Sequence, residues 1–361
     1  MRGEKQTQVS VTCLINVETM IPAGHPIRTI KRLLGEVLAK MDARFERMYA
    51  ANGRPSIPPE RLLLAKVLMA LYSIRSERQF CERLQYDLLF RWFLDLNPDE
   101  ATFDHSSFAQ NQKRLLRHEV ADRFFAEVVQ LAMKRGWVSD EHFSVDATLI
   151  EAWASLKSFK PKGDEGDKGD GNGWSDFKGQ QRRNDTHEST TDAEAKLVRK
   201  GDGREAKLAF AGHATMENRH GLCVLFEVQS AVGSDAETAS RQIAQLQHRG
   251  FTPRTVGADR GYWSNKFITA LRGRGVVPHP APLTGRPLLG VKVRSRAHQL
   301  SQRCRRKIEE IFGWAKTTGC FRKSRYLGIE RTHAAAQYVV AAYNLVRLAR
   351  LSLGPPNLAR A

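Results

Sequence analysis

The spacing of apolar residues changes at Gly136, and this change restricts the possible folds more than any other feature of the sequence. Before it, apolar residues recur every three or four positions, which is typical of buried helix faces. One such face consists of Ile30, Leu33, Leu34, Val37, Leu38 and Met41. After it, segments such as EHFSVDATLI alternate and are rich in strand-forming residues. The sequence therefore predicts an all-α helical N-terminal domain over residues 1–135 and an α/β domain over residues 136–355.

The clearest helices of the N-terminal part are expected at residues 30–48, 62–72, 106–116 and 120–135. Pro59 and Glu60 suit the first turn of the second helix, and Ser106 or Ser107 suits the N-cap of the third. Arginines on these helices could grip DNA ends in a helix-turn-helix-like bundle. They could equally be solvated on a purely structural bundle, and the sequence leaves both interpretations open.

The second part predicts a mixed sheet covered by helices. Strands are expected at EHFSVDATLI, 207–214, 222–230, TVGAD and VVPHPA, and helices at 236–249, 265–272, 300–317 and 334–351. This order suits an RNase-H-like α/β catalytic domain. Between about 157 and 204 the chain is rich in Gly, Lys and Asp and poor in apolar residues, so a flexible polar insertion is expected there.

The net charge indicates a polyanionic partner. Lys and Arg number 57 against 39 for Asp and Glu, which gives a formal charge of +18 and a pI near 9.9. Such an excess favours nucleic-acid binding, although a ribosome-associated protein or a merely basic enzyme would also fit. Five scattered cysteines without a CxxC pair argue against a disulfide framework and structural zinc. No run approaches the ~18 apolar residues of a membrane span, so we expect a reducing, bacterial cytoplasm.

Two aspartates lie where strands are expected. Asp146 belongs to FSVDAT, an apolar strand in which an unpaired carboxylate would be costly to bury. Asp259 belongs to VGADRGY, where a strand gives way to a glycine-containing turn. Carboxylates at strand ends hold metal ions in many enzymes, but they also cap helices and pair with arginine. Either role fits each aspartate taken singly.

The third candidate is Glu309, on the expected helix at 300–317. On a continuous helix Arg305 and Lys316 would share its face, so that the acid could hold an ion while the cations hold DNA phosphates. Cations dominate the surrounding segment 291–331, which contains twelve Lys and Arg residues and three Glu residues. The alternative is an amphipathic surface helix with ion pairs between successive turns.

Several segments together resemble the IS5 group of bacterial insertion-sequence transposases, within the IS4-like DDE enzymes. They are SIPPERLLLAKVLMALYSIRSERQFCERLQYDLLFRWFLDL, DEHFSVDATLIEAWASLKSF, THESTTDAEAKLVRKG, LAFAGHATMENRHGL, GADRGY, SQRCRRKIEEIFGWAKT and AAYNLVRLARL. The family signature reads Tyr, two residues, Arg, three residues, Glu, six residues, Lys. Arg305, Glu309 and Lys316 match it, whereas Gln302 stands where tyrosine is usual.

The resemblance implies that Asp146, Asp259 and Glu309 are the catalytic triad and hold two Mg²⁺ ions, with Mn²⁺ as a possible substitute. Such an enzyme binds the terminal inverted repeats of its element, cleaves the DNA and transfers the strand to target DNA, and is expected to act as a homodimer. The residues expected to contact DNA are Arg305, Lys316, Arg303, Arg306 and Lys307. A nuclease without strand transfer, and an inactive or domesticated DNA-binding derivative, are the alternatives.

Overall fold

The computed structural model describes residues 16–49, 52, 56–162, 182–199, 201, 203–283, 285, 290–293 and 295–353. Cys13 therefore lies outside the described residues, and the other cysteines are unpaired. No helix in the described ranges is both long and apolar enough to cross a membrane.

The N-terminal part is helical, as the apolar spacing predicts. Its helices are α1 (Val17–Met20), α2 (Pro26–Ala39), α3 (Asp42–Glu46), α4 (Pro59–Leu71), α5 (Glu77–Tyr86), α6 (Leu88–Phe93), α7 (His105–Arg117) and α8 (Val120–Lys134). Two details differ from the prediction. The single helix expected at 30–48 is split into α2 and α3 at Lys40. The N-cap of α7 is Asp104, whose carboxylate accepts from the backbone amides of Ser106 and Ser107.

The second part contains a six-stranded mixed sheet. Its strands are β1 (His142–Glu151), β4 (Lys196–Arg199), β5 (Ala206–Glu217), β6 (Leu222–Ser230), β7 (Thr255–Ala258) and β8 (Val277–Pro280). β5 is antiparallel to β1, and both β4 and β6 pair with β5. On the other side of β1, β7 and β8 follow in parallel. The strands expected from alternation and apolar runs are all present.

The helices that accompany the sheet are α9 (Asp235–His248), α10 (Asn265–Arg272), α11 (Arg296–Arg305), α12 (Ile308–Lys316) and α13 (Ile329–Ser352), with short 3₁₀ turns at Leu156–Ser158 and Arg260–Tyr262. The continuous helix predicted at 300–317 is wrong, because the chain forms two helices, α11 and α12, separated by a turn at Arg306 and Lys307. The helix predicted at 334–351 is present and begins earlier.

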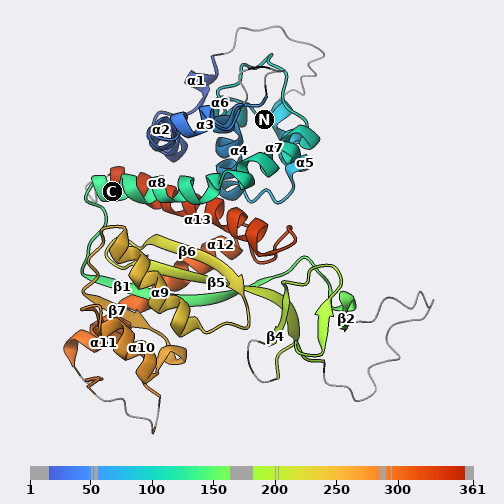
Figure 1. Ribbon diagram of the computed structural model, residues 1–361. Helices are drawn as coiled ribbons and strands as arrows, with labels where there is room; N and C mark the ends of the chain where they lie inside the picture. Colours follow the sequence, from blue (N-terminus) through green and yellow to red (C-terminus); the bar gives the residue numbers. More distant parts are fainter. Residues whose placement is uncertain are drawn as a thin grey trace, which may run out of the picture.

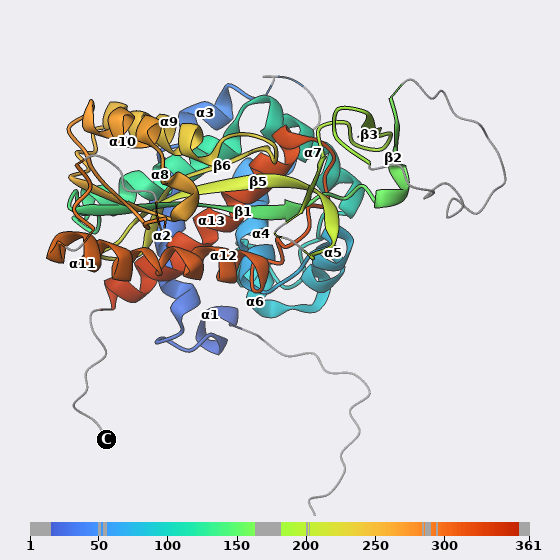
Figure 2. The ribbon, with the colours of Figure 1, turned by 90° about the horizontal axis from the view of Figure 1, so that it is seen from below.

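The polar segment 157–204 has more regular structure than its composition predicts. Its described residues include β2 (Phe159–Pro161) and β3 (His187–Ser189), which pair with each other, and β4, which joins the main sheet through β5. Residues 163–181, to which most of the glycines of the expected insertion belong, lie outside the described residues. Figures 1 and 2 both show β2 at the edge of the molecule, beyond the main sheet.

Helix α13 joins the two parts of the chain. It packs against α2, α4 and α8 of the N-terminal part and against β6 of the sheet. Figure 1 shows α8 and α13 lying between the N-terminal helices and the sheet. The buried apolar residues of both parts form one continuous cluster. The N-terminal helices therefore share a hydrophobic core with the sheet through α13.

Residues just before β4 cap the start of α13. The carboxylate of Asp192 accepts from the backbone amide of Gly328 at 2.9 Å, and that of Glu194 accepts from the amide of Ile329 at 3.0 Å. Carboxylates at a helix N-terminus satisfy free amides and complement the helix dipole. The THESTTDAEAK segment thus fixes the entry to α13.

Candidate active site

Alternation along β1 decides which way Asp146 points. Its neighbour Val145 pairs with Thr215 of β5, whose hydroxyl donates to Gln242 of α9 at 2.9 Å. Because successive side chains point to opposite faces, Asp146 and Thr148 point to the other face, which α11 and α12 cover. Asp146 thus faces the helices that contain Arg305 and Glu309.

Asp259 lies beside Asp146 because of the parallel register. Phe143 pairs with Val256 and Ser144 with Gly257, so two further residues bring the end of β7 and Asp259 level with Asp146. The two strands are neighbours, and such strands are ~5 Å apart. Asp259 is the N-cap residue of the 3₁₀ turn Arg260–Tyr262, but its side chain makes no capping hydrogen bond there. A purely capping role is therefore not observed for Asp259.

Arg305, at the end of α11, bridges the two aspartates. Its Nη1 lies 3.5 Å from the carboxylate of Asp146, and its Nη2 lies 3.6 Å from that of Asp259. The side chains of Arg305 and Asp146 are 15% and 19% exposed, whereas that of Asp259 is 51% exposed. The aspartates are thus within reach of one guanidinium, and the site opens to solvent on the Asp259 side.

Glu309 follows the turn between α11 and α12. There the backbone amides of Lys307, Glu309 and Glu310 donate to the third residue before them, which is a 3₁₀ pattern. Arg306 and Lys307 keep helical backbone angles, so the chain tightens between α11 and α12 without a sharp change of conformation. Among the residues that the structure describes, no cation lies within ion-pair distance of Glu309, whereas Glu310 pairs with Arg347 at 3.0 Å. Arg347 belongs to α13, so the pair links two helices, and the described residues show no ion pair between successive turns of α12 at either Glu309 or Glu310.

The charges of Asp259 and Glu309 both act on Asp146. Burial raises the pKa of Asp146 to about 6, and the charges of Asp259 and Glu309 add to the increase. The amide of Ala147, which donates to Asp146 at 2.8 Å, and the charge of Arg305 oppose it. Asp146 is thus a partly buried carboxylate in a group of negative charges with one cationic neighbour. A multivalent cation would stabilise such a group.

The cations expected to bind DNA differ in their exposure and in the groups that they contact. Lys316 donates to the hydroxyl of Thr148, on the same face of β1 as Asp146. Lys307 donates to the backbone carbonyl of Asn218 at 3.3 Å, in the turn after β5. Arg303 and Arg306 are exposed. Arg305 and Lys316 therefore lie on the face of the sheet that holds Asp146. Arg303 lies on α11, and Arg306 and Lys307 form the connection from α11 to α12.

The close packing of α11 against β7 depends on Gly257, which lies within β7. A Cβ at this position would lie 3.0 Å from the hydroxyl oxygen of Ser301 and 3.5 Å from the Cβ of Arg305, both on α11. Glycine therefore allows α11 to lie close against β7, which sets the position of Arg305.

Replacing Gly257 with alanine is expected to destabilise the protein by roughly 1–3 kcal/mol, because the added methyl group pushes α11 from the sheet. Urea unfolding followed by circular dichroism measures this change. Gly261→Ala is the control, since a Cβ added at that glycine would meet no atom within 4 Å. Equal free energies of unfolding for the two variants would show that α11 can shift to accommodate the added methyl group without destabilising the protein.

Three residues near the acids have no role that could be assigned from the sequence. Thr148 receives the hydrogen bond of Lys316. Tyr262 is buried, and burial raises its pKa well above the usual value, with Asp146 and Asp259 among the charges that add to it. Gln302, found where the family signature has tyrosine, donates to the backbone carbonyls of Ala258 and His279 and so ties α11 to the ends of β7 and β8. Tyr262 belongs to the GADRGY segment, which is the one sequence signal that could have drawn attention to it.

The carboxylates suit a hard divalent ion in chemistry, since such ions prefer oxygen ligands. As the side chains lie, the described part of the chain contains no group of three His, Cys, Asp or Glu side chains arranged to hold a metal ion. Arg305 lies between Asp146 and Asp259. Binding of an ion by both aspartates would therefore require the guanidinium to move away.

Comparison with protein families identifies the chain. The family model described as transposase domain (DUF772) matches residues 15–114, and the family model described as transposase DDE domain matches residues 138–345, more than half of the 361 residues. The chain belongs to the DDE transposase family. It is accordingly a metal-dependent DNA transposase, and enzymes of this family use divalent metals. The two family models do not distinguish the IS5 group, which stays a prediction.

No curated protein matches this transposase. Among solved structures, the piggyBac transposase synaptic complex with hairpin DNA is similar with a TM-score of 0.41 and 9% identity, covering 91% of this chain and 76% of that one. The Mos1 transposase paired-end complex with the left transposon end is similar with a TM-score of 0.22 and 9% identity, covering 81% of this chain and 88% of that one. The Mos1 strand transfer complex is similar with a TM-score of 0.22 and 12% identity, covering 86% of this chain and 82% of that one. Such low scores mark a distant likeness only.

Proposed function

We propose that this transposase binds the terminal inverted repeats of an insertion sequence, cleaves the DNA at each end and joins the freed 3′ end to target DNA. One observation supports it most. Asp146 and Asp259 share the guanidinium of Arg305, and the charges of Asp259 and Glu309 both act on Asp146. Two acids far apart in the sequence thus share one cation, and the charge of a third acts on the first of them, in a chain of the DDE family.

In this proposal Asp146, Asp259 and Glu309 hold two Mg²⁺ ions, for which Mn²⁺ could substitute. The ions supply a strong nucleophile near neutral pH and stabilise the charge on the leaving oxygen. Arg305, released from the aspartates, turns to a phosphate of the DNA, and Lys316 lies on the same side. Arg303, Arg306 and Lys307 contact the flanking backbone, where their charges attract the polyanion.

We further propose that the N-terminal helices, residues 1–135, bind the DNA ends, and that residues 136–355 form an RNase-H-like catalytic domain with the polar insertion. The order of strands in the sheet, with antiparallel β5 and parallel β7 beside β1, supports this fold. Membership of the IS5 group is part of the proposal. So is a homodimer on DNA, because two element ends must be cut and joined together.

A strand-transfer assay with labelled element ends, a target plasmid and Mg²⁺ tests the function. We expect joined products from the wild-type protein. Asp259→Asn is expected to abolish both cleavage and joining while it still binds the ends, because it removes a charge from the acidic group and leaves the helices intact. Cleavage without joined products would favour the nuclease, and binding without cleavage by the wild type would favour an inactive derivative. Cleavage by Asp259→Asn would contradict the assignment of that residue.

A further inference from the structure

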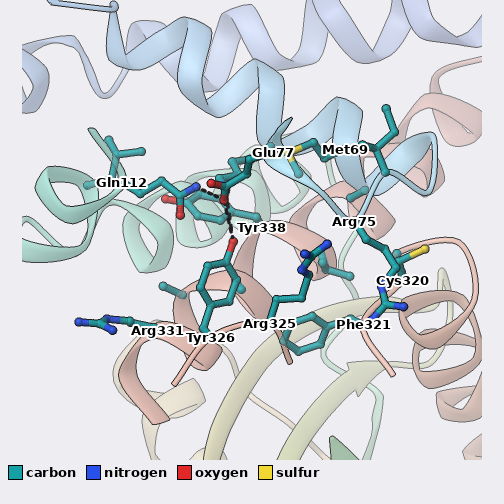
Figure 3. Close-up of a pocket in the computed structure, with 18 of the residues that line it drawn as sticks. Met69, Arg75, Glu77, Gln112, Cys320, Phe321, Arg325, Tyr326, Arg331 and Tyr338 are labelled. Carbon is teal, nitrogen blue, oxygen red and sulfur yellow. Dashed lines mark hydrogen bonds and ion pairs between the residues drawn. The ribbon is translucent and has the colours of Figure 1, made fainter. Parts of the chain in front are cut away.

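A cavity of about 290 Å³ lies where the N-terminal helices meet the C-terminal part of the chain. Residues of α4, α5 and α7 line one side, and the connection from α12 to α13 and the first turns of α13 line the other (Figure 3). Much of the wall is apolar, with contributions from Met69, Ile74, Leu115, Phe321 and Val339. The cavity is separate from the group formed by Asp146, Asp259 and Glu309, none of which lines it.

The charged residues of the lining are mostly cationic. One carboxylate, Glu77, faces six cations, which are Lys66, Arg75, Lys113, Lys323, Arg325 and Arg331. Lys66 is 7% exposed and pairs with Glu77 at 3.0 Å, so these two charges cancel. Within the described ranges, none of Arg75, Arg325 and Arg331 has an acidic side chain at ion-pair distance. The cavity therefore combines an apolar wall with an uncompensated excess of positive charge.

Glu77 is held in place by other groups and cannot neutralise the remaining cations. Gln112 and Tyr326 both donate to its carboxylate, as Figure 3 shows, and the Tyr326 bond measures 3.1 Å. Burial alone would raise the pKa of Glu77, but Lys66 together with Gln112 and Tyr326 keeps it below the usual value. The arginines of the lining are left to meet an anion from outside.

An exposed aromatic ring lies beside the same cations. Trp153, shortly after β1, is 48% exposed, and the cationic groups of Lys323 and Arg325 lie 5.6 and 5.9 Å from its ring. Arg325 therefore belongs both to the cavity lining and to the surroundings of Trp153. Cations next to an exposed tryptophan are the combination that stacks a base and holds its phosphate.

We propose that the cavity binds one unpaired nucleotide of the DNA substrate, with its base against the apolar wall and its phosphates on Arg325 and Arg331, while Trp153 stacks on the adjoining base. This inference rests on the proposed function, because it takes DNA as the substrate. An anion with a planar apolar body matches both features of the lining. A cavity of this size accepts a single base and excludes a duplex. The N-terminal helices and the C-terminal part would then hold the same nucleotide.

Fluorescence anisotropy tests the site with the full-length protein, a short labelled oligothymidylate and a duplex of the same length. Arg325→Ala combined with Arg331→Ala is expected to weaken single-strand binding about tenfold and to lower its salt dependence by about one released ion. Ala335→Leu, which narrows the cavity from α13, is expected to weaken single-strand binding without changing its salt dependence. Trp153→Ala is expected to weaken it about tenfold as well. Arg274→Ala, an exposed arginine after α10, is the matched control and should bind as the wild type does.

Single-strand binding that is unchanged in both Ala335→Leu and the double arginine variant would overturn the proposal. So would an equal loss of single-strand and duplex binding in the arginine variant with no effect of Ala335→Leu, which would indicate only a basic surface. Thymidine monophosphate distinguishes a free nucleotide from DNA, and binding as tight as that of the oligomer would overturn the DNA source. All arms omit metal and require no cleavage. A protein without transposase activity could therefore still bind single strands as proposed, and an active transposase could fail to do so. The two proposals can thus be tested separately.

Discussion

Replacing Glu309 with glutamine is expected to lower the rate of DNA cleavage about a hundredfold to a thousandfold, the size of loss seen when one group that stabilises transition-state charge is removed. The change keeps the shape of the side chain and removes its charge. Glu309 has no ion pair among the described residues, and its charge reaches Asp146, so the loss would act on the acidic group itself. Cleavage of a labelled element end in the presence of Mg²⁺ measures the rate.

Glu310→Gln is the matched control, because it makes the same chemical change at the next residue. Glu310 pairs with Arg347 at 3.0 Å, and its side chain is 56% exposed, so we expect cleavage to stay close to the wild-type rate. Both variants should bind element ends with wild-type affinity. If Glu309→Gln cleaved as fast as Glu310→Gln, Glu309 would not belong to the catalytic group.

Replacing Glu77 with glutamine is expected to lower the free energy of unfolding by about 3 kcal/mol, the cost of leaving a buried charge without its partner. Lys66 is a buried residue of α4, and its ammonium group lies 3.0 Å from Glu77 of α5 and 4.9 Å from the ring of Phe108 of α7. Glutamine could still accept the hydrogen bond of Tyr326, so the loss would come mainly from the unpaired ammonium group. Urea denaturation followed by circular dichroism measures the change.

Glu82→Gln provides the comparison for Glu77→Gln on the same helix. Glu82 is exposed, so its replacement is expected to change the free energy of unfolding by less than about 0.5 kcal/mol. A loss of similar size in both variants would mean that helix α5 responds to charge in general, and not to the pair with Lys66.

Much of the sheet could be predicted from the sequence, because buried strands leave strong local patterns. The apolar run of β7 ends just before Asp259, whereas β1 continues to Glu151 and Asp146 lies within it, so the first strand does not end at Asp146. The apolar residues around both aspartates still predict the two strands. Asp146 and Asp259 could be singled out as candidate site residues because they lie in or next to these apolar strands. Their nearness depends on the parallel pairing of residues 142–144 with 255–257, which only the folded sheet establishes.

The break between α11 and α12 could not be predicted from local sequence patterns. The apolar residues Ile308, Ile311, Phe312 and Ala315 keep helical spacing, and no glycine or proline marks the turn before them. The 3₁₀ hydrogen bonds at Lys307 and Glu309 lie between α11, which contacts β7, and α12, which contacts β1, and these long-range contacts leave no local pattern in the sequence. The family signature names Glu309 directly, whereas the helical spacing predicted one continuous helix where the chain forms two.

Two further differences have simple causes. Ser106 and Ser107 are both good N-caps, but Asp104 accepts from the amides of both at once. The polar composition of the segment 157–204 predicts a flexible insertion, yet β4 pairs with β5, and Phe159 and Ala195 are buried. The cavity beside Lys66 was also not predictable, since its walls come from residues more than 200 positions apart.

The position of α13 has a consequence for where the DNA is cut. This helix contacts α2 and α4 on one side and β6 on the other, so the N-terminal helices cannot rotate against the sheet without separating apolar surfaces. A DNA end held by those helices would then reach Asp146 and Asp259 at a constant offset from its point of attachment. The position of cleavage would therefore be determined by its distance in base pairs from the attached end, and not by the base sequence at the cleaved bond.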